Sequence, residues 1–166
     1  MKVFSPDVLY PFVYSCIHTG CRLSELLNLQ WKQVDFSNGL LHINTGKTGK
    51  VRSLKMTDGL RILLSKVVRS CDFVFTRHGN RLSKTTYGTL LKIYKKQSKV
   101  DKDWTTHCLR RTFAYQFLRN GGSLYQLSAF LGHSSIKVTY DVYAQLQACD
   151  VELSQNPLLI MIELVQ

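Results

Sequence analysis

A change of hydrophobic pattern at residue 34 restricts the fold of this chain more than any other feature of its sequence. Short apolar runs at 34–36, 40–43 and 51–54 are separated by the turn sequences Ser-Asn-Gly and Thr-Gly-Lys-Thr-Gly-Lys. Runs of this length between turns are typical of antiparallel hairpins. The segment therefore predicts a small three-stranded antiparallel sheet. Lys47 falls in its second turn, beside glycines that permit unusual backbone dihedrals.

Helical spacing is found on both sides of this sheet. Ser5 and Pro6 predict a helix start, because serine caps free amides and proline is tolerated in the first turn, and this helix is expected to run to about His18. Gly20 interrupts it, and helical spacing resumes at 22–27. Further helices are predicted, in chain order, at 58–69, 84–97, 107–120, 123–131 and 136–143. The expected fold is mainly α with one small sheet, in the α+β class.

The length of the chain suits one domain. With 166 residues, 45% of them hydrophobic, it can bury a sizeable core but hardly two. No repeat, low-complexity segment or linker divides it, so residues 1–166 are expected to form a single domain. The tail at 150–166 contains the apolar run 158–162. This run either covers the core or docks on a neighbouring subunit.

Cysteine usage and hydropathy bear on the compartment. The five cysteines are odd in number, scattered and never spaced as C-x-x-C, so neither a disulfide framework nor a zinc site is indicated. No basic stretch followed by an apolar run lies near Met1, and the longest apolar run is too short to cross a bilayer. We expect a cytoplasmic protein without a membrane partner.

The charge of the chain indicates a class of partner. Twenty-two Lys and Arg residues against eleven Asp and Glu residues give a net charge of +11. Such an excess favours a polyanion, and nucleic acid first of all. The alternative is a soluble protein that merely happens to be basic. Charge alone says nothing about chemistry.

Two residues of the predicted helix at 107–120 can face one anion. His107 and Arg110 are three residues apart, so they lie on the same helix face. Such a pair is a weak signal by itself, because it also arises often on solvated helix faces.

Four further residues carry groups suited to phosphate chemistry: Arg22, Lys47, His133 and Tyr143. Arg22 opens a helix after a turn, and Glu25, three residues later, can orient its guanidinium. His133 follows an apolar helix and a glycine, and Tyr143 comes ten positions after it. Each has an ordinary alternative: a surface ion pair, a satisfied core histidine, a packing tyrosine and, for Lys47, a solvated turn lysine. Their joint occurrence gives them weight.

Together these motifs resemble the tyrosine recombinase (phage integrase) family, from residue 19 to residue 143. The site of that family combines the arginine of a T-G-x-R-x-x-E-L block, a hairpin lysine, an H-x-L-R pair, the histidine of L-G-H and a tyrosine shortly after it. By resemblance these catalytic roles fall on Arg22, Lys47, His107, Arg110, His133 and Tyr143, with Glu25 in support. The resemblance also implies the fold of the family's catalytic domain.

The resemblance implies a covalent mechanism. Arg22 and Arg110 are expected to bind the non-bridging phosphate oxygens, for which their planar forks are suited. Tyr143 attacks the phosphorus, forms a 3′-phosphotyrosyl bond and releases a 5′-hydroxyl, and a 5′-hydroxyl from a partner strand then reseals the break. The bond energy is kept in the protein–DNA link, so no cofactor, ATP or metal is required.

Three side chains are expected to manage protons and charge during this cycle. A tyrosine hydroxyl titrates near 10, so it needs a base at neutral pH, and His107 is the favoured one. Lys47 is the family-implied general acid for the departing 5′-oxygen. His133 is expected to bond a phosphate oxygen.

Two tyrosines follow His133 closely enough to compete for the role of nucleophile. Tyr140 lies seven positions after it and Tyr143 ten. The context T-Y-D-V-Y resembles the T-x-D-x-Y ending of family variants with ten, so Tyr143 is chosen and Tyr140 is expected to pack.

The family usually has an N-terminal core-binding domain, which is absent here, so we expect this sequence to be a piece of a longer protein.

The implied partners are double-stranded DNA with a specific recombination site and other copies of the protein, as a tetramer on DNA. Two alternatives stay open: an inactive DNA-binding module, and a topoisomerase IB-like nicking-closing enzyme. Exchange products would separate the latter from a recombinase.

Seven basic side chains outside the motifs are candidates for contact with the DNA backbone; otherwise they form solvated faces. They are Arg77, Arg81, Lys84, Lys92, Lys95, Lys96 and Lys99.

Overall fold

The computed structural model describes residues 8–45, 50–97, 104–133 and 135–147. The predicted helix start at Ser5, the hairpin turn with Lys47, Lys99 and the tail at 150–166 lie outside these residues.

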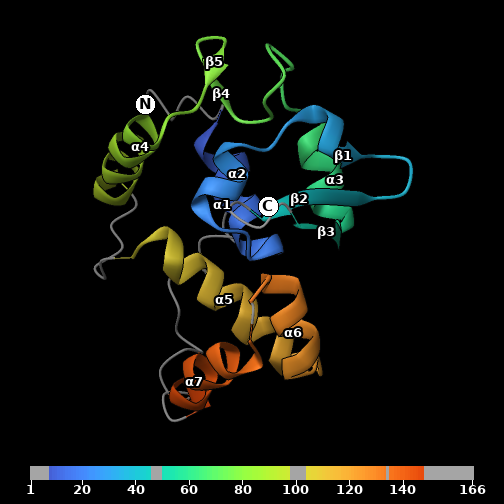
Figure 1. Cartoon of the computed structure of the whole chain (residues 1–166). Coiled ribbons are helices and arrows are strands. Elements are labelled where there is room, and N and C mark those ends of the chain that lie inside the picture. The colour runs from blue at the N-terminus through green and yellow to red at the C-terminus, as the bar shows by residue number, and fades with distance from the viewer. Residues whose placement is uncertain (1–7, 46–49, 98–103, 134, 148–166) are drawn as a thin grey trace.

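Helices predominate in the described part, which also contains one three-stranded sheet and one two-stranded sheet (Figure 1). In chain order the elements are α1 (Leu9–Thr19), α2 (Leu23–Leu27), the 3-10 turn η1 (Trp31–Gln33), β1 (Val34–Asp35), β2 (Leu40–Thr45), β3 (Lys50–Lys55), α3 (Asp58–Ser65), β4 (Thr76–Arg77), β5 (Asn80–Arg81), α4 (Lys84–Gln97), α5 (Thr106–Arg119), α6 (Leu124–Leu131) and α7 (Ile136–Gln147). The predicted α+β fold is confirmed. Two helix ends differ from prediction, since α3 ends at Ser65 and α7 continues to Gln147.

The three-stranded sheet has the predicted antiparallel order β1-β2-β3. Its register pairs Val34 with Leu41 and Ile43 with Arg52. Alternate residues of a strand face opposite sides, and the inward residues Leu41, Ile43 and Leu54 are at most 2% exposed. The sheet is therefore one wall of the core.

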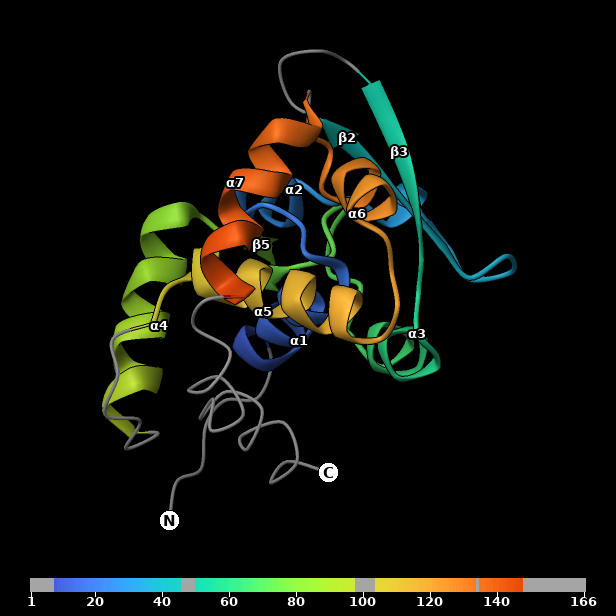
Figure 2. The same ribbon diagram turned by 90° about the horizontal axis from the view of Figure 1, so that it is seen from below.

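Helix α1 lies at the centre of the fold and packs against α5, α3 and α4 (Figures 1 and 2). Phe12, on its buried face, is fully inaccessible to solvent. Its ring lies 4.9 Å from that of Phe75 and 4.7 Å from that of Tyr87, measured between centroids. Aromatic pairs at these separations add to the free energy gained from burial.

A second, smaller cluster of apolar side chains joins α5 to α6. Ala114, Leu127 and Leu131 are its buried members, and Leu109, one turn earlier on α5, belongs to the main core. Helix α5 thus spans both clusters. Arg110 follows Leu109 directly, so it lies where the two clusters meet.

Gly20 ends α1 in the left-handed conformation, with φ of 60°. Its amide donates to the carbonyl of Cys16 at 2.9 Å. A Cβ at this position would collide with the ring of Phe113 and touch Leu131 at 3.0 Å. Glycine is therefore required twice, for backbone conformation and for space.

We expect Gly20→Ala to lower the free energy of unfolding by about 2–4 kcal/mol, because left-handed strain and overpacking add. Gly39→Ala is the matched control, since Gly39 has φ of +66° but open space around it. Its cost should be confined to strain, about 1–2 kcal/mol. Denaturant unfolding of both variants measures the difference, and equal losses would contradict the packing argument.

Candidate active site

Arg110 is the most enclosed charge of the site, with 6% of its surface exposed. Its Nη1 donates to the carbonyl oxygen of Gly20 at 2.6 Å, and its Nη2 donates to that of Leu131 at 2.8 Å. Burial, followed by the nearby charge of Arg22, lowers the pKa of Arg110 to about 10. The guanidinium therefore stays protonated at neutral pH, fixed between the ends of α1 and α6.

Arg22 lies on the other side of the α6 terminus. Its Nη2 donates to the carbonyl oxygen of Gly132 at 3.3 Å. The last carbonyls of a helix have no partner within the helix and carry partial negative charge. Two arginines, Arg22 and Arg110, thus gather at the end of α6, although they are far apart in the sequence.

His133 follows that terminus directly and completes the cluster. Its Nε2 lies 3.0 Å from Nη2 of Arg110, and its Nδ1 lies 2.8 Å from the hydroxyl oxygen of Thr139, on α7. Because arginine only donates, Nε2 must accept, and the ring proton then sits on Nδ1 and is donated to Thr139. Burial lowers the pKa of His133 to about 4, with further lowering by Arg110, Arg22, Arg52 and His107.

This lowered pKa predicts a loss of stability in mild acid. The unfolded chain binds a proton at His133 near pH 6.5, whereas the folded chain does so only near 4. The stability that the neutral His133 ring provides is therefore fully present above pH 6.5, and it is lost as the pH falls toward 4. Because the ring is partly exposed, we expect the free energy of unfolding to fall by only about 1 kcal/mol between pH 6.5 and 4.5. Urea unfolding of wild type and His133→Gln over this pH range measures the effect. If the free energy of unfolding of both proteins changes equally with pH, the prediction is contradicted.

Glu25 holds Arg22 in place. Its Oε2 accepts from the backbone amide of Arg22 at 2.7 Å, and its Oε1 accepts from Nη1 at 3.1 Å. The carboxylate side chain is 5% exposed and the arginine 43%. The carboxylate thus holds the backbone and Nη1 of Arg22, while much of the arginine side chain remains accessible.

Arg52 belongs to the same cluster, and the sequence analysis missed it. Its Nη1 and Nη2 donate to the two oxygens of Glu25 at 2.9 and 2.8 Å. The available signal was strand alternation: Arg52 is two residues before the inward-facing Leu54, so it shares its side of β3. A charge on the inner face of a strand needs a partner, which here is Glu25.

His107 is exposed and lies one turn before Arg110 on α5, on the same face. His107 also contributes electrostatically to the lowered pKa of His133.

Tyr143 lies within α7, but the position of its side chain is outside the described part. In the sequence it comes four residues after Thr139, whose hydroxyl is bonded to His133. Tyr140, the competing candidate, is 59% exposed. Of the six predicted catalytic residues, the described structure therefore brings four together (Arg22, His107, Arg110 and His133) and leaves Lys47 and the Tyr143 hydroxyl undescribed.

A basic pocket of about 420 Å³ adjoins the cluster, lined by Arg22, Ser24, Asn28, Arg81 and Lys84 among others. Arg81 is anchored there, because its Nη1 donates to Asn28 at 2.6 Å and its guanidinium lies 5.4 Å from the ring centre of Phe73.

The remaining basic candidates lie apart from this pocket. Arg77, Lys92 and Lys96 are exposed, whereas Lys95 lies 5.5 Å from the ring centre of Trp104.

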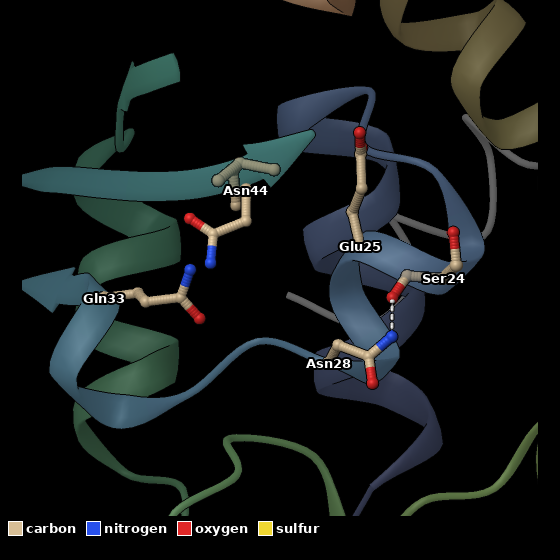
Figure 3. A pocket seen from close by; sticks show the side chains of 6 residues that line it. Ser24, Glu25, Asn28, Gln33 and Asn44 are labelled. Carbon is tan, nitrogen blue, oxygen red and sulfur yellow. Dashed lines mark hydrogen bonds between the residues drawn. The ribbon is translucent and has the colours of Figure 1, made fainter. Parts of the chain in front are cut away.

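A smaller pocket of about 190 Å³ lies between α2 and β2 and is lined mainly by polar side chains (Figure 3). Gln33 is already engaged, because it donates to the carbonyl of His42 at 2.7 Å and accepts from the amide of Gln30 at 2.9 Å. Asn28 donates to the carbonyl of Ser24 at 2.7 Å. These bonds tie η1 to β2 and close the last turn of α2.

Neither a candidate metal centre nor a candidate membrane-spanning helix is present among the described residues. No group of three or more His, Cys, Asp or Glu side chains among them could hold a metal ion. In the same part of the chain, no helix is long and apolar enough to cross a membrane.

The fold and this cluster define a class of protein. The sequence model of the phage integrase family matches residues 9–149, and the chain belongs to that family.

Named relatives are tyrosine recombinases. The chain is similar to tyrosine recombinase XerA of Saccharolobus solfataricus, at 32% identity over 136 residues, which are 81% of this chain and 45% of the relative. It is also similar to XerD of Listeria monocytogenes, at 29% identity over 153 residues, which are 84% of this chain and 51% of that protein. The chain thus spans about half the length of these relatives.

Solved structures agree. A crystal structure of XerA recombinase matches with a TM-score of 0.76 and 28% identity, over 91% of this chain and 58% of that one. The Tn1549 transposon integrase in complex with transposon right end DNA matches with a TM-score of 0.72 over 94% of this chain and 60% of the other, and at 24% identity it supports the fold alone.

Proposed function

We propose that this chain is the catalytic part of a site-specific DNA recombinase, which cuts and rejoins strands through a 3′-phosphotyrosyl bond to Tyr143. The observation that carries the proposal is the meeting of Arg22, Arg110 and His133 at the end of α6, with α7 tied to the same point through Thr139. Donors from three separate parts of the chain converge where a tyrosine-bearing helix begins.

The arginine pair suits a phosphodiester in its transition state. Charge develops on the non-bridging oxygens during attack, and preorganised donors stabilise it without reorganising at that moment. Arg110 is held rigidly by two carbonyl oxygens, whereas Arg22 is accessible to a ligand. The two arginines can bind one phosphate together, Arg110 as a fixed positive charge and Arg22 as an exposed guanidinium that donates hydrogen bonds.

In the cleavage step, the Tyr143 oxygen forms a bond to phosphorus while the bond from phosphorus to the 5′-oxygen breaks. The tyrosine proton passes to His107, and the leaving 5′-oxygen takes a proton from Lys47. Resealing reverses these transfers, with a partner strand's 5′-hydroxyl as the attacking group. Atoms and charge balance without ATP or a redox partner.

His133 is poised to respond to a phosphate. In the free protein its Nε2 accepts from Arg110, and burial together with the surrounding arginines holds its pKa near 4. A bound phosphate adds a negative charge, which raises the pKa and allows Nε2 to gain a proton and donate to a phosphate oxygen.

Double-stranded DNA with a specific site is the proposed substrate, and other copies of the chain are the proposed partners for strand exchange. The net charge of +11 and the basic pocket beside Arg22 support a DNA partner.

The test is an incubation with supercoiled plasmid DNA in EDTA without ATP, followed by detergent denaturation. We expect protein-linked DNA with free 5′-hydroxyl ends. A requirement for a divalent metal, or 5′-phosphate ends without linked protein, would contradict the proposal.

Salt dependence tests the proposed backbone contacts. Neutralising Lys84 and Lys92 together, by Lys84→Gln and Lys92→Gln, should lower the slope of log affinity against log salt by about 2. Lys66→Gln is the control, because Lys66 follows α3 on the side of the molecule opposite α4 (Figures 1 and 2). A slope that the double variant leaves unchanged removes these lysines from the interface.

A further inference from the structure

Two arginines share the carboxylate of Glu25, which extends from α2 (Figure 3). Arg52 donates to both oxygens, at 2.9 and 2.8 Å, and Arg22 donates to the same two oxygens, through its backbone amide at 2.7 Å and its Nη1 at 3.1 Å. A carboxylate has about four acceptor positions. All of them are thus occupied by these two residues.

The two arginines differ in exposure. The side chain of Arg52 is 11% exposed, against 43% for Arg22. Burial raises the pKa of Glu25, but the hydrogen bonds and charges of Arg52 and Arg22 outweigh it and hold the pKa below its usual value. Glu25 is therefore ionised, and Arg52 is the buried charge that balances it.

The pair is poorly explained as a device for stability. A buried ion pair generally stabilises a fold no better than apolar residues of similar size. The Nε of Arg52 is also buried without a hydrogen-bond partner in the described structure, which adds a cost. A role in the neighbouring site accounts for the residue better.

Charge balance shows what that role is. Glu25 with Arg52 is neutral, so the full positive charge of Arg22 remains available to a ligand. Without Arg52, the carboxylate would be balanced by Arg22 alone, and it would draw the guanidinium inward and offset its charge.

We infer that Arg52 is a positioning residue: it engages Glu25 so that Arg22 presents an uncompensated guanidinium to the scissile phosphate. The identity of that ligand rests on the proposed function, whereas the anion site itself does not. Arg52 also links β3, which begins three residues after Lys47, to the start of α2. It thereby ties β3 to the phosphate site.

The test is the dissociation constant for inorganic phosphate, followed by NMR shifts, in variants whose folding is checked by thermal unfolding. Arg52→Gln should weaken binding about tenfold, comparable with the loss of one charge-assisted hydrogen bond. Arg22→Gln should do the same, and the double variant should be no worse than Arg22→Gln alone, because Arg52 acts through Arg22. Arg61→Gln, which removes an exposed arginine paired with Asp58, should change nothing.

A second double variant distinguishes the effect of the Arg52 charge on phosphate binding from the effect of its packing. In Arg52→Gln with Glu25→Gln no carboxylate competes for Arg22, so phosphate binding should recover to within about threefold of wild type. This double variant also keeps the test decisive where Arg52→Gln alone fails to fold, because it buries no unpaired charge.

Three results would overturn the inference. They are a folded Arg52→Gln protein that binds phosphate as wild type does while Arg22→Gln does not, a loss in the Arg22→Gln, Arg52→Gln double variant equal to the sum of the two single losses, and no recovery of phosphate binding in Arg52→Gln with Glu25→Gln. If Arg22→Gln and Arg110→Gln also bind normally, the anion site fails as a whole, and the proposed function fails with it.

Discussion

Tyr143→Phe should form no covalent complex with DNA, a loss of at least about 10⁴-fold relative to wild type. The substitution removes only the hydroxyl oxygen, so the packing of α7 and the binding of DNA should change little. Every other group that we place in the mechanism acts on the reaction between this oxygen and phosphorus. The measurement is the yield of DNA-linked protein after denaturation, with DNA affinity measured in parallel.

Tyr140→Phe is the matched control for this prediction. Tyr140 lies three residues earlier on the same helix and is 59% exposed, so its loss should leave the adduct yield unchanged. The opposite result, an adduct from Tyr143→Phe but none from Tyr140→Phe, would move the nucleophile to Tyr140 and leave the rest of the site intact.

Arg110→Lys should lower the rate of adduct formation by about 10²–10³-fold, the usual effect of removing one preorganised donor from a developing oxyanion. Lysine keeps the charge, but its single ammonium cannot reproduce a planar fork that bonds Gly20, Leu131 and His133 at once. The loss should appear mainly in the rate of cleavage and less in DNA affinity, because many other cations contribute to binding.

Arg111→Gln controls for general loss of positive charge on α5, since Arg111 is the exposed neighbour of Arg110. Thermal unfolding is measured for both variants, because Arg110 also ties the ends of α1 and α6 together. An Arg110→Lys protein that is fully folded and cleaves at the wild-type rate would exclude Arg110 from transition-state stabilisation.

The sequence predicted the main sheet well because its signal is local. Short segments that contain apolar residues, at 40–43 and 51–54, flank a glycine-containing turn in the sequence, and the observed register joins the two strands over six residue pairs. The β4–β5 hairpin was missed, because its strands have two residues each and none of them is buried. Its turn uses His78 and Gly79, both with positive φ, and no apolar pattern marks it.

The site was predicted in part for the same reason. Arg22, Arg110 and His133 stand in short motifs, so sequence alone could select them. Arg52 could not be selected this way, because its role depends on a contact with Glu25, twenty-seven residues away. The proton on Nδ1 of His133 likewise follows from two contacts, with Arg110 and Thr139, that only the folded chain brings together.

The most direct test of the central claim is to map the tyrosine linked to DNA. Asp141 separates the two candidates, so a protease that cleaves before aspartate releases residues 141–149, which contain Tyr143 but not Tyr140. After nuclease trimming of the adduct, mass spectrometry should find a 3′-linked nucleotide on that peptide. A nucleotide on the peptide that ends at Tyr140, or on no tyrosine at all in an adduct that forms, would contradict the account.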